Sequence, residues 1–230
     1  MATYGRLSTV AGSVDAVRER IAAACERANR SPDDVTLVAV TKNFPPEAIR
    51  EAWEAGVRHF GENRVQEAAA KLPSLAGLSP PPTWHMVGHL QTNKVKTAVG
   101  LFDIIQSVDS FHLAESISKR APHSARVPVF LEVNVSGEAT KHGFAPDELP
   151  RGAVAARGLP GIDVRGLMTI APLVDDPEAL RPLFRRLREL AESVELPELS
   201  MGMTDDFEVA VEEGATFVRV GRAIFGERLA

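Results

Sequence analysis

The sequence predicts an α/β protein made of one (β/α)8 TIM barrel with an extra N-terminal helix. Three observations support this prediction: the chain has 230 residues, strand-like and helix-like apolar patterns alternate along it, and eight strand-like runs can be counted. A single α/β barrel commonly has about 200 to 250 residues, whereas an open doubly wound sheet of this length usually has fewer strands. We therefore treat residues 1–230 as a single domain, with residues 1–34 as the N-terminal helix and its lead-in.

The N-terminal helix is predicted over residues 10–30. Apolar side chains recur there at spacings of three and four, and charged side chains fill the other face; the apolar positions are Val10, Val14, Val17, Ile21, Cys25 and Ala28. Cys25 is the only cysteine, and its place on the apolar stripe favours a core residue over a reactive thiol. Ser31 and Pro32 then break the helix.

The barrel units follow in order along the chain. The first strand is predicted at residues 35–40, where a β-branched apolar run is typical of a strand covered on both faces. Later strands are predicted at 57–61, 84–87, 103–106, 127–135, 164–168, 199–201 and 216–220. The helices between them are predicted at 47–55, 65–72, 91–99, 110–120, 146–156, 177–194 and 205–213. Because no Gly/Ser-rich linker interrupts this alternation, we expect one domain.

Composition argues against several classes of partner. The formal charge is 26 − 31 = −5, which does not suit binding along a nucleic-acid backbone. No run approaches the roughly 18 apolar residues that a membrane span needs. One cysteine and an N-terminus without a signal-peptide core predict a cytoplasmic location.

Functional side chains of such a barrel lie at the C-terminal ends of its strands. Lys42 follows the run 35–40 directly. A desolvated lysine amine at that place can attack an aldehyde and form a Schiff base. A lysine that reaches the rim or pairs with a carboxylate is an equal alternative on position alone.

Two glycine-containing loops predict a phosphate site. Ser200-Met201-Gly202-Met203-Thr204 follows the seventh strand, and Gly221-Arg222 follows the eighth and opens a short turn at 223–225. The loops after strands seven and eight form the usual phosphate site of this fold, because glycines allow close approach and N–H groups donate to the anion. The alternative is tight turns, with Thr204 capping a helix that begins at Asp205.

Arg219 completes this constellation. A guanidinium on a barrel strand needs an acceptor, and the strands of Lys42 and Arg219 become neighbours where the barrel closes. A lysine for an aldehyde, an arginine for a ring acceptor and a phosphate cradle together describe a pyridoxal 5′-phosphate (PLP) site.

The sequence resembles the YggS/PROSC family of pyridoxal phosphate homeostasis proteins from about residue 10 to its end. The matching motifs are Ala-Val-Thr-Lys at 39–42, Phe-Gly-Glu-Asn-Arg-Val-Gln-Glu at 60–67, Trp-His-Met-Val-Gly-His-Leu-Gln-Thr-Asn-Lys at 84–94, Val-Asn-Val-Ser-Gly-Glu at 133–138, Lys-His-Gly at 141–143, Gly-Leu-Met at 166–168, Ser-Met-Gly-Met-Thr-Asp-Asp at 200–206 and Val-Arg-Val-Gly-Arg-Ala-Ile-Phe-Gly at 218–226. Residues 43–45 and His89 depart from the family pattern, and these differences concern the rim.

This resemblance implies a barrel like the N-terminal domain of alanine racemase, with PLP, the vitamin B6 cofactor, held as an aldimine on Lys42. It implies that Arg219 faces the pyridine nitrogen and that Asn63 lies near the cofactor. The residues implied around the phosphate are Ser200, Gly202, Met203, Thr204 and Gly221.

Three functions remain open at this point. A cofactor reservoir is our main interpretation: the protein holds PLP, buffers it or delivers it to PLP-dependent apoenzymes, and turns over no amino acid. A racemase-like PLP enzyme needs a second acid/base, in this architecture a tyrosine from a further C-terminal domain, but the chain ends after the eighth unit and its only tyrosine is Tyr4. A Schiff-base aldolase acting on a sugar phosphate is the third possibility. Without the racemase-type domain we expect a monomer.

Other polar residues are interpreted as structural. His59 and His85 have no ligand partner at metal-binding spacing, so we expect core or rim histidines and no metal. Lys141 is interpreted as a solvated loop lysine. Asp205 and Asp206 are expected in the first turn of a helix, where acidic residues stabilise the dipole.

Overall fold

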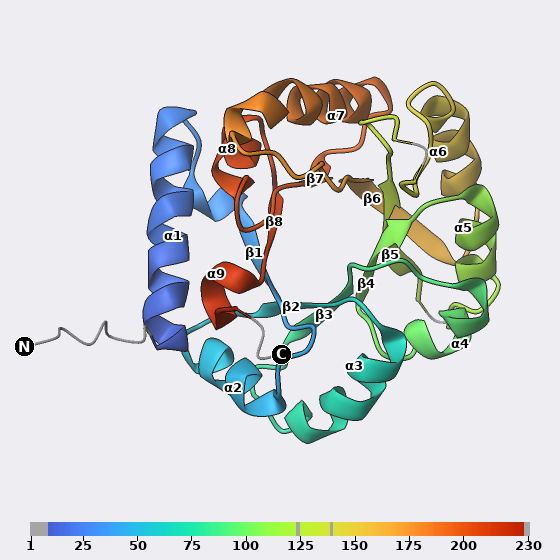
Figure 1. The fold of residues 1–230 in the computed structure, drawn as a ribbon. Coiled ribbons are helices and arrows are strands. Elements are labelled where there is room, and N and C mark those ends of the chain that lie inside the picture. The colour runs from blue at the N-terminus through green and yellow to red at the C-terminus, as the bar shows by residue number, and fades with distance from the viewer. Residues whose placement is uncertain (1–8, 123–124, 139, 228–230) are drawn as a thin grey trace, which may run out of the picture.

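The computed structural model describes residues 9–122, 125–138 and 140–227, and within them eight parallel strands form a closed barrel (Figure 1). Strands that follow one another in the chain are neighbours in the barrel. The last strand, β8 (Phe217–Val220), closes the ring by pairing with β1 (Thr36–Val40). The fold predicted from the sequence is therefore confirmed.

Six further strands complete the barrel, and helices surround it. The other strands are β2 (His59–Glu62), β3 (Thr83–Met86), β4 (Ile104–Val108), β5 (Val127–Glu132), β6 (Ile162–Met168) and β7 (Glu198–Ser200). The helices are α1 (Val10–Arg27), α2 (Pro46–Glu54), α3 (Val65–Lys71), α4 (Val95–Ala98), α5 (Phe111–Ser118), α6 (Leu149–Arg157), α7 (Arg181–Ser193), α8 (Phe207–Glu212) and α9 (Arg222–Phe225). None of the described helices is both long enough and apolar enough to cross a membrane.

Two predicted helices differ from the structure in an informative way. The helix predicted at 91–99 is a 3-10 turn, Thr92–Lys94, followed by the short α4. The helix predicted from Asp205 begins at Phe207, so Asp205 and Asp206 precede it and are not in its first turn. The Asp206 side chain points back along the chain, and its carboxylate accepts a hydrogen bond from the backbone N–H of Met203. Thr204 is therefore not the capping residue either.

Helix α1 covers the place where the barrel closes. It packs against α2, α8 and α9, and Figure 1 shows it standing outside β1 and β8. Arg20 and Arg27 reach from it to Glu208 and Glu212 of α8. Cys25 is fully buried on the inner face of α1, which confirms its interpretation as a core residue.

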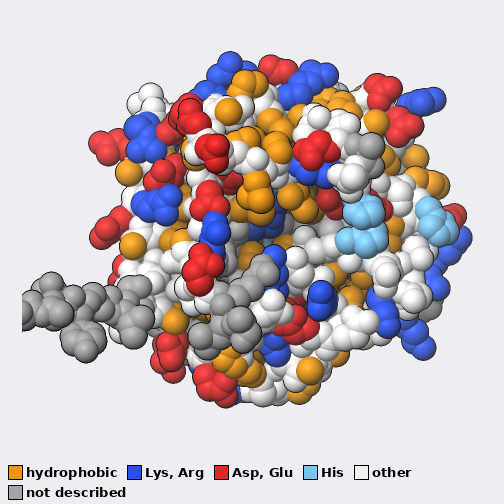
Figure 2. All heavy atoms as spheres, viewed as in Figure 1, with side chains coloured by type: hydrophobic (Ala, Val, Ile, Leu, Met, Phe, Trp, Pro, Cys, Tyr) orange, Lys and Arg blue, Asp and Glu red, His pale blue; other side chains and the backbone are white. Residues whose placement is uncertain are grey.

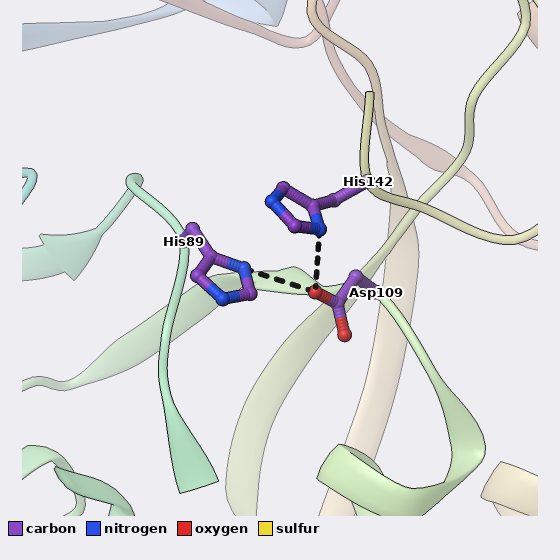
Figure 3. Close-up of side chains that lie close together, drawn as sticks. All are labelled: His89, Asp109 and His142. Atoms are coloured by element: carbon purple, nitrogen blue, oxygen red, sulfur yellow. Dashed lines mark ion pairs between the residues drawn. The ribbon is translucent and has the colours of Figure 1, made fainter. Parts of the chain in front are cut away.

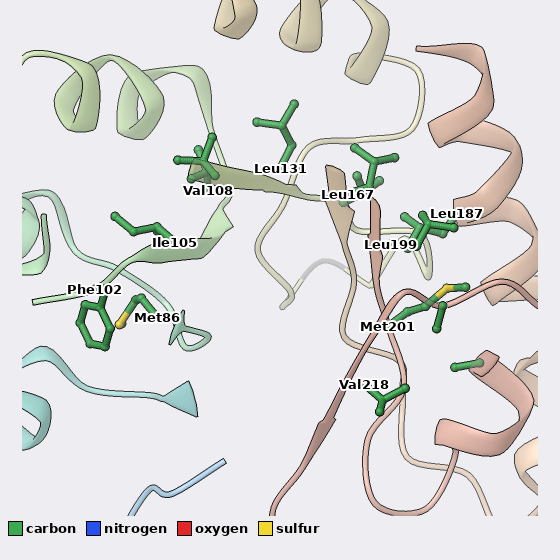
Figure 4. Packing of buried hydrophobic residues seen from close by; sticks show 14 of the residues in the cluster. Met86, Phe102, Ile105, Val108, Leu131, Leu167, Leu187, Leu199, Met201 and Val218 are labelled. Carbon is green, nitrogen blue, oxygen red and sulfur yellow. The ribbon is translucent and has the colours of Figure 1, made fainter. Parts of the chain in front are cut away.

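Apolar residues form two separate clusters. The larger one lies between the strands and the surrounding helices, and Figure 4 shows part of it, including Ile105, Leu131 and Leu199. The smaller cluster consists of Ile104, Phe130 and Met168, with Phe217 packed against it. Because neighbouring residues of a strand face opposite sides, Ile104 and Ile105 belong to different clusters. The barrel interior is thus only partly apolar, and polar side chains occupy the rest.

Candidate functional site

The predicted site residues Lys42 and Arg219 come from adjacent strands. Strand β1 pairs with β8 in a register that places Val38 opposite Arg219 and Ala39 opposite Val220. Lys42 is half-buried and lies two residues beyond the end of β1. The expected adjacency of these two strands is confirmed, and the C-terminal ends of β1 and β8 place Lys42 beside the loop that begins at Gly221.

Helix α3 holds the backbone on both sides of Lys42. The Lys71 ammonium donates a hydrogen bond to the carbonyl oxygen of Thr41 at 2.7 Å. The backbone N–H of Asn43 donates to Glu67 Oε1 at 2.5 Å. Lys71 and Glu67 form an ion pair of 2.7 Å with each other. One ion pair on α3 therefore fixes the peptide groups that precede and follow Lys42, including Asn43 with its positive φ of 65°.

Glu62 binds the same lysine, Lys71, from inside the protein. It is fully buried, and its Oε1 accepts hydrogen bonds from Lys71 at 2.7 Å and from the Thr41 hydroxyl at 2.6 Å. Burial raises the pKa of Glu62, and the hydrogen bonds from Lys71 and Thr41 oppose that rise. Its other oxygen, Oε2, is buried without a hydrogen-bond partner in the described part of the chain. Removal of the lysine would leave a costly uncompensated charge.

Arg219 lies buried in the barrel interior. Its two terminal nitrogens donate to the Ser200 hydroxyl and to the Thr169 carbonyl, each at 2.7 Å. Burial lowers the pKa of Arg219 to about 10, against the opposing effects of Asp206 and Glu132. The guanidinium therefore stays charged at neutral pH and is held in one orientation.

A chain of hydrogen bonds continues from Arg219 across the barrel. The Ser200 hydroxyl donates to Gln106 Oε1 at 2.7 Å, and Gln106 Nε2 lies 2.8 Å from His85 Nδ1. His85 Nε2 then lies 3.0 Å from His59 Nδ1. Since the Gln106 amide donates to Nδ1, His85 carries its proton on Nε2 and donates it to His59.

The two histidines of this hydrogen-bonded network, His59 and His85, are neutral. Burial lowers the pKa of His85 to about 3 and also lowers the pKa of His59. The sequence predicts core or rim histidines at these positions, and the structure places His85 in the core and leaves His59 half-buried. Sequence reasoning missed Gln106, which links them to Arg219, although a polar residue inside an apolar strand is a usable signal.

The loop after β7 needs glycine at one position. Gly202 has φ of +92°, and a Cβ there would lie 2.6 Å from the Cβ of Ala210. Its carbonyl accepts a hydrogen bond from the backbone N–H of Arg219 at 2.9 Å, which joins this loop to β8. Met203 and Thr204 are half-buried, and no hydrogen bond of the Thr204 hydroxyl is found within the described residues. The hydroxyl of Ser200, in contrast, is already used by Arg219 and Gln106.

Gly221 starts the loop after β8. A Cβ at Gly221 would lie 3.2 Å from the carbonyl oxygen of Val40. The chain then enters α9, whose first N–H groups have no acceptor within the helix. The two glycine loops thus meet at the mouth of the barrel beside the end of β1, as the sequence predicts for this fold.

Asn63 lies one strand away, after β2. A Cβ at Gly88 would lie 2.5 Å from the carbonyl oxygen of Asn63, so the loops after β2 and β3 are in close contact. A pocket of about 420 Å³ opens between them, and of the predicted site residues it includes only Asn63. Its lining residues are Asn63, Arg64, Val65, Gln66, Met86, Gly88, His89, Leu90, Gln91 and Lys94.

Glu132 is a second polar residue that sequence reasoning missed. It ends β5 and is 6% exposed. Burial raises its pKa to about 7, with a further rise from Asp109 and an opposing effect from Arg219. A carboxyl group with such a pKa changes its protonation near neutral pH. The signal was available, because Glu132 follows five residues of the predicted strand at 127–135.

Of two further residues named from the sequence, Lys141 and Tyr4, only Lys141 lies within the described residues. Lys141 is not simply solvated: it forms an ion pair with Glu138 at 2.7 Å and donates to the Ile170 carbonyl at 3.3 Å. Its side chain is about one-fifth exposed. Tyr4 lies outside the described residues.

The fold and the strand-end residues define a class of protein, a parallel barrel with a lysine beyond the first strand and glycine loops beyond the last two. A family model described as the N-terminal domain of alanine racemase matches residues 13–229. An alanine racemase of Clostridium difficile has the same fold, with a TM-score of 0.73 and 14% identity, over 95% of this chain and 57% of that one.

Closer relatives narrow this class to one family. The pyridoxal phosphate homeostasis protein of Aquifex aeolicus is 48% identical over 219 residues, covering 92% of this chain and 95% of that protein. The Pseudomonas aeruginosa protein of the same name is 45% identical over 227 residues, covering 96% and 97%. The structure of PipY of Synechococcus elongatus with PLP bound has a TM-score of 0.78 and 42% identity, covering 91% and 100%. This chain belongs to the pyridoxal phosphate homeostasis protein family.

Proposed function

We propose that this protein binds PLP and takes part in its intracellular homeostasis. It holds the cofactor as a Schiff base on Lys42 and buffers or delivers it, without amino-acid turnover. The register that places the strand of Lys42 beside the strand of Arg219 carries this proposal, because it brings an amine, a fixed guanidinium and two glycine loops to one mouth. The PLP-bound PipY structure, at 42% identity, supports the choice of ligand.

The residues present fit this cofactor. Lys42 supplies the amine that condenses with the aldehyde and releases water. The loop of Gly202, Met203 and Thr204 and the turn after Gly221 supply N–H groups and a hydroxyl for the phosphate. Ser200 ends β7 directly before this loop and contributes through that position, because its hydroxyl is bonded within the barrel.

Arg219 has a role toward the ring of the cofactor in this proposal. When bound, PLP supplies an electron sink whose strength depends on the group at its pyridine nitrogen. Arg219 keeps its proton at neutral pH and is fixed by Ser200 and Thr169, so it stabilises an unprotonated nitrogen. A poor electron sink suits a protein that stores the cofactor. Asn63 lies at the rim, where we place it near the cofactor.

A racemase-like activity is the second candidate, and Glu132 is the observation that favours it. A buried carboxyl group with a pKa of about 7 is suited to proton transfer. Racemisation at a single site needs two acid/base groups on opposite faces of the substrate. Among the described residues we assign no second group opposite Lys42, and for this reason we favour the storage role.

The finer parts of the proposal concern partners and location. We infer that PLP-dependent apoenzymes receive the cofactor, that the protein acts as a monomer, and that it acts in the cytoplasm. The acidic net charge of −5 supports a protein that does not act on nucleic acid. We assign no catalytic residue.

The test of this function is the visible spectrum of purified protein after addition of PLP, with and without borohydride. We expect an absorption band near that of a protonated imine, and borohydride should fix the cofactor to the chain in wild type. Lys42→Ala should lose the fixed cofactor, whereas Lys96→Ala, on α4, should retain it. A wild-type protein that takes up no PLP would overturn the proposal. Racemisation of any amino acid would overturn the storage role in favour of the enzyme.

A further inference from the structure

Three neighbouring strands bring two histidines and an aspartate together on loops other than those of Lys42 and Arg219, and His89 also lines the pocket that includes Asn63. His89 follows β3, Asp109 directly follows β4, and His142 lies in the loop after β5. His89 Nδ1 lies 3.1 Å from Asp109 Oδ2, and His142 Nδ1 lies 3.9 Å from the same oxygen (Figure 3). One ligand atom from each residue therefore falls within 4.8 Å of the other two.

This cluster has the charge and access that a cation site needs. The Asp109 side chain is mostly buried, at 13% exposure, whereas His89 and His142 are 44% and 58% exposed. Within the described ranges Asp109 forms no ion pair with a lysine or arginine, and its ion-pair partners are the two imidazoles. The buried carboxyl group of Glu132 also lies close enough for the charge of Asp109 to raise its pKa. In Figure 2 pale blue histidine side chains lie at the surface of the barrel face formed by these loops.

We propose that His89, Asp109 and His142 bind a divalent transition-metal ion of the Zn²⁺ or Co²⁺ type. Imidazole nitrogens with one carboxylate oxygen suit such ions, whereas Ca²⁺ and Mg²⁺ prefer oxygen ligands. Ligand atoms around a tetrahedral ion with bonds of about 2.1 Å lie about 3.4 Å apart. The two Nδ1–Oδ2 distances, 3.1 and 3.9 Å, lie on either side of that value, and all three ligand atoms lie within 4.8 Å of one another.

Binding requires one movement that the exposure of the histidines permits. Their rings are stacked, with centroids 4.0 Å apart and planes at 15°. Parallel rings do not direct two nitrogen lone pairs at one ion, so one imidazole turns about its side-chain bonds when the ion arrives. Both histidines are on loops and exposed, whereas Asp109 stays fixed at the end of β4.

The three ligands leave a coordination position open. A site with three protein ligands keeps a position for water or a second ligand. A bound ion would also link the loops after β3, β4 and β5 to one another. The proposed ligand class is therefore a divalent transition-metal ion, with a water or a small anion as its fourth ligand. This inference does not depend on Lys42 or on PLP.

The test uses untagged, chelator-treated full-length protein, titrated with Co²⁺ and followed by visible absorption, with Zn²⁺ as competitor. We expect one ion per chain, with cobalt bands that Zn²⁺ abolishes. His89→Gln, His142→Gln and Asp109→Asn should each weaken binding by about tenfold or more. His112→Gln, which changes an exposed histidine on α5, should bind as wild type does.

Two measurements make the outcome decisive. Thermal unfolding in chelator shows whether each variant is folded, and only folded variants are compared. Lys42→Ala should bind Co²⁺ with unchanged affinity, so failure of PLP uptake and failure of metal binding are distinguishable. Absence of cobalt bands in the wild type, or equal affinity in wild type and all three ligand variants, would overturn the proposal.

Discussion

Lys71 donates to the Thr41 carbonyl across 2.7 Å, and this bond fixes the residue that directly precedes Lys42. The same ammonium is paired with both Glu62 and Glu67 at 2.7 Å. The loop that carries the proposed Schiff-base lysine is therefore anchored by a buried charge and not by the strand alone.

Lys71→Met is expected to destabilise the protein by about 3 to 5 kcal/mol, because it leaves Glu62 and Glu67 without their cation. The free energy of unfolding in urea measures this loss. The double variant Lys71→Met with Glu62→Gln should be less destabilised than the sum of its single changes, since the buried negative charge is then gone as well. If the losses of the two single variants simply added in the double variant, the coupling between Lys71 and Glu62 would be contradicted.

Arg219→Ala is expected to retain PLP less well, while the imine with Lys42 still forms. The reason is that Lys42 supplies the covalent bond and Arg219 supplies only a contact to the ring in our proposal. The rate of cofactor loss on dialysis, followed by absorbance, measures the effect. Arg186→Ala is the matched control, because Arg186 is exposed on α7 and pairs with Glu189. An unchanged rate in Arg219→Ala would refute the assigned contact.

His85 is expected to make the protein less stable as the pH falls. Its pKa is about 3 in the folded chain and 6.5 ordinarily, so between these values the unfolded chain binds a proton that the folded chain does not. The contribution of neutral His85 to the free energy of unfolding is fully present above pH 6.5. Below pH 6.5 it is lost at a rate that approaches about 1.4 kcal/mol per pH unit. Urea unfolding of wild type and His85→Gln at pH 7.5 and 5.5 measures it. The variant should lose less stability than wild type over this interval.

Glu132 is expected to act in the opposite direction. Its pKa is about 7 in the folded chain against 4.5 ordinarily, so the folded chain binds the additional proton. Its stabilising contribution is fully present below pH 4.5 and is lost as the pH rises to about 7, at up to about 1.4 kcal/mol per pH unit. Glu132→Gln should therefore gain stability relative to wild type between pH 5 and pH 8. A difference that stays constant with pH would show that the pKa is ordinary.

Gly202→Ala is expected to cost about 2 to 4 kcal/mol, from the left-handed backbone and from the contact of its Cβ with Ala210. Gly137→Ala is the control, because Gly137 also has positive φ, at +71°, and a Cβ there meets nothing within 4 Å. It should cost about 1 to 2 kcal/mol. Denaturant unfolding compares the two, and equal losses would argue against the steric contact.

The periodic features of the sequence were enough to predict the barrel, because strand and helix patterns depend on residues close in the chain. The adjacency of the strands of Lys42 and Arg219 also followed, since a closed barrel joins its first and last strands. The network around Ser200 did not follow. Its partner Arg219 is on the neighbouring strand β8, but Gln106 is on β4, and only the arrangement of side chains inside the barrel brings that amide to Ser200.

The helix start at residue 205 was wrong for a related reason. The Asp206 carboxylate accepts a hydrogen bond from the N–H of Met203 in the turn before the helix, a local interaction that periodicity does not reveal. Similarly, the clustering of His89, Asp109 and His142 depends on how three loops of different length meet at the rim.

The pairing of β1 with β8 also has a consequence for biosynthesis. The amine of the proposed site leaves the ribosome with the first barrel unit, and its guanidinium and anion cradle leave with the last two. A growing chain can therefore form its early strands and helices, yet it contains no complete cofactor site until the ring has closed. Under the proposed function, retention of the cofactor then requires the closed ring, so that a bound cofactor marks a chain whose synthesis and folding are both complete.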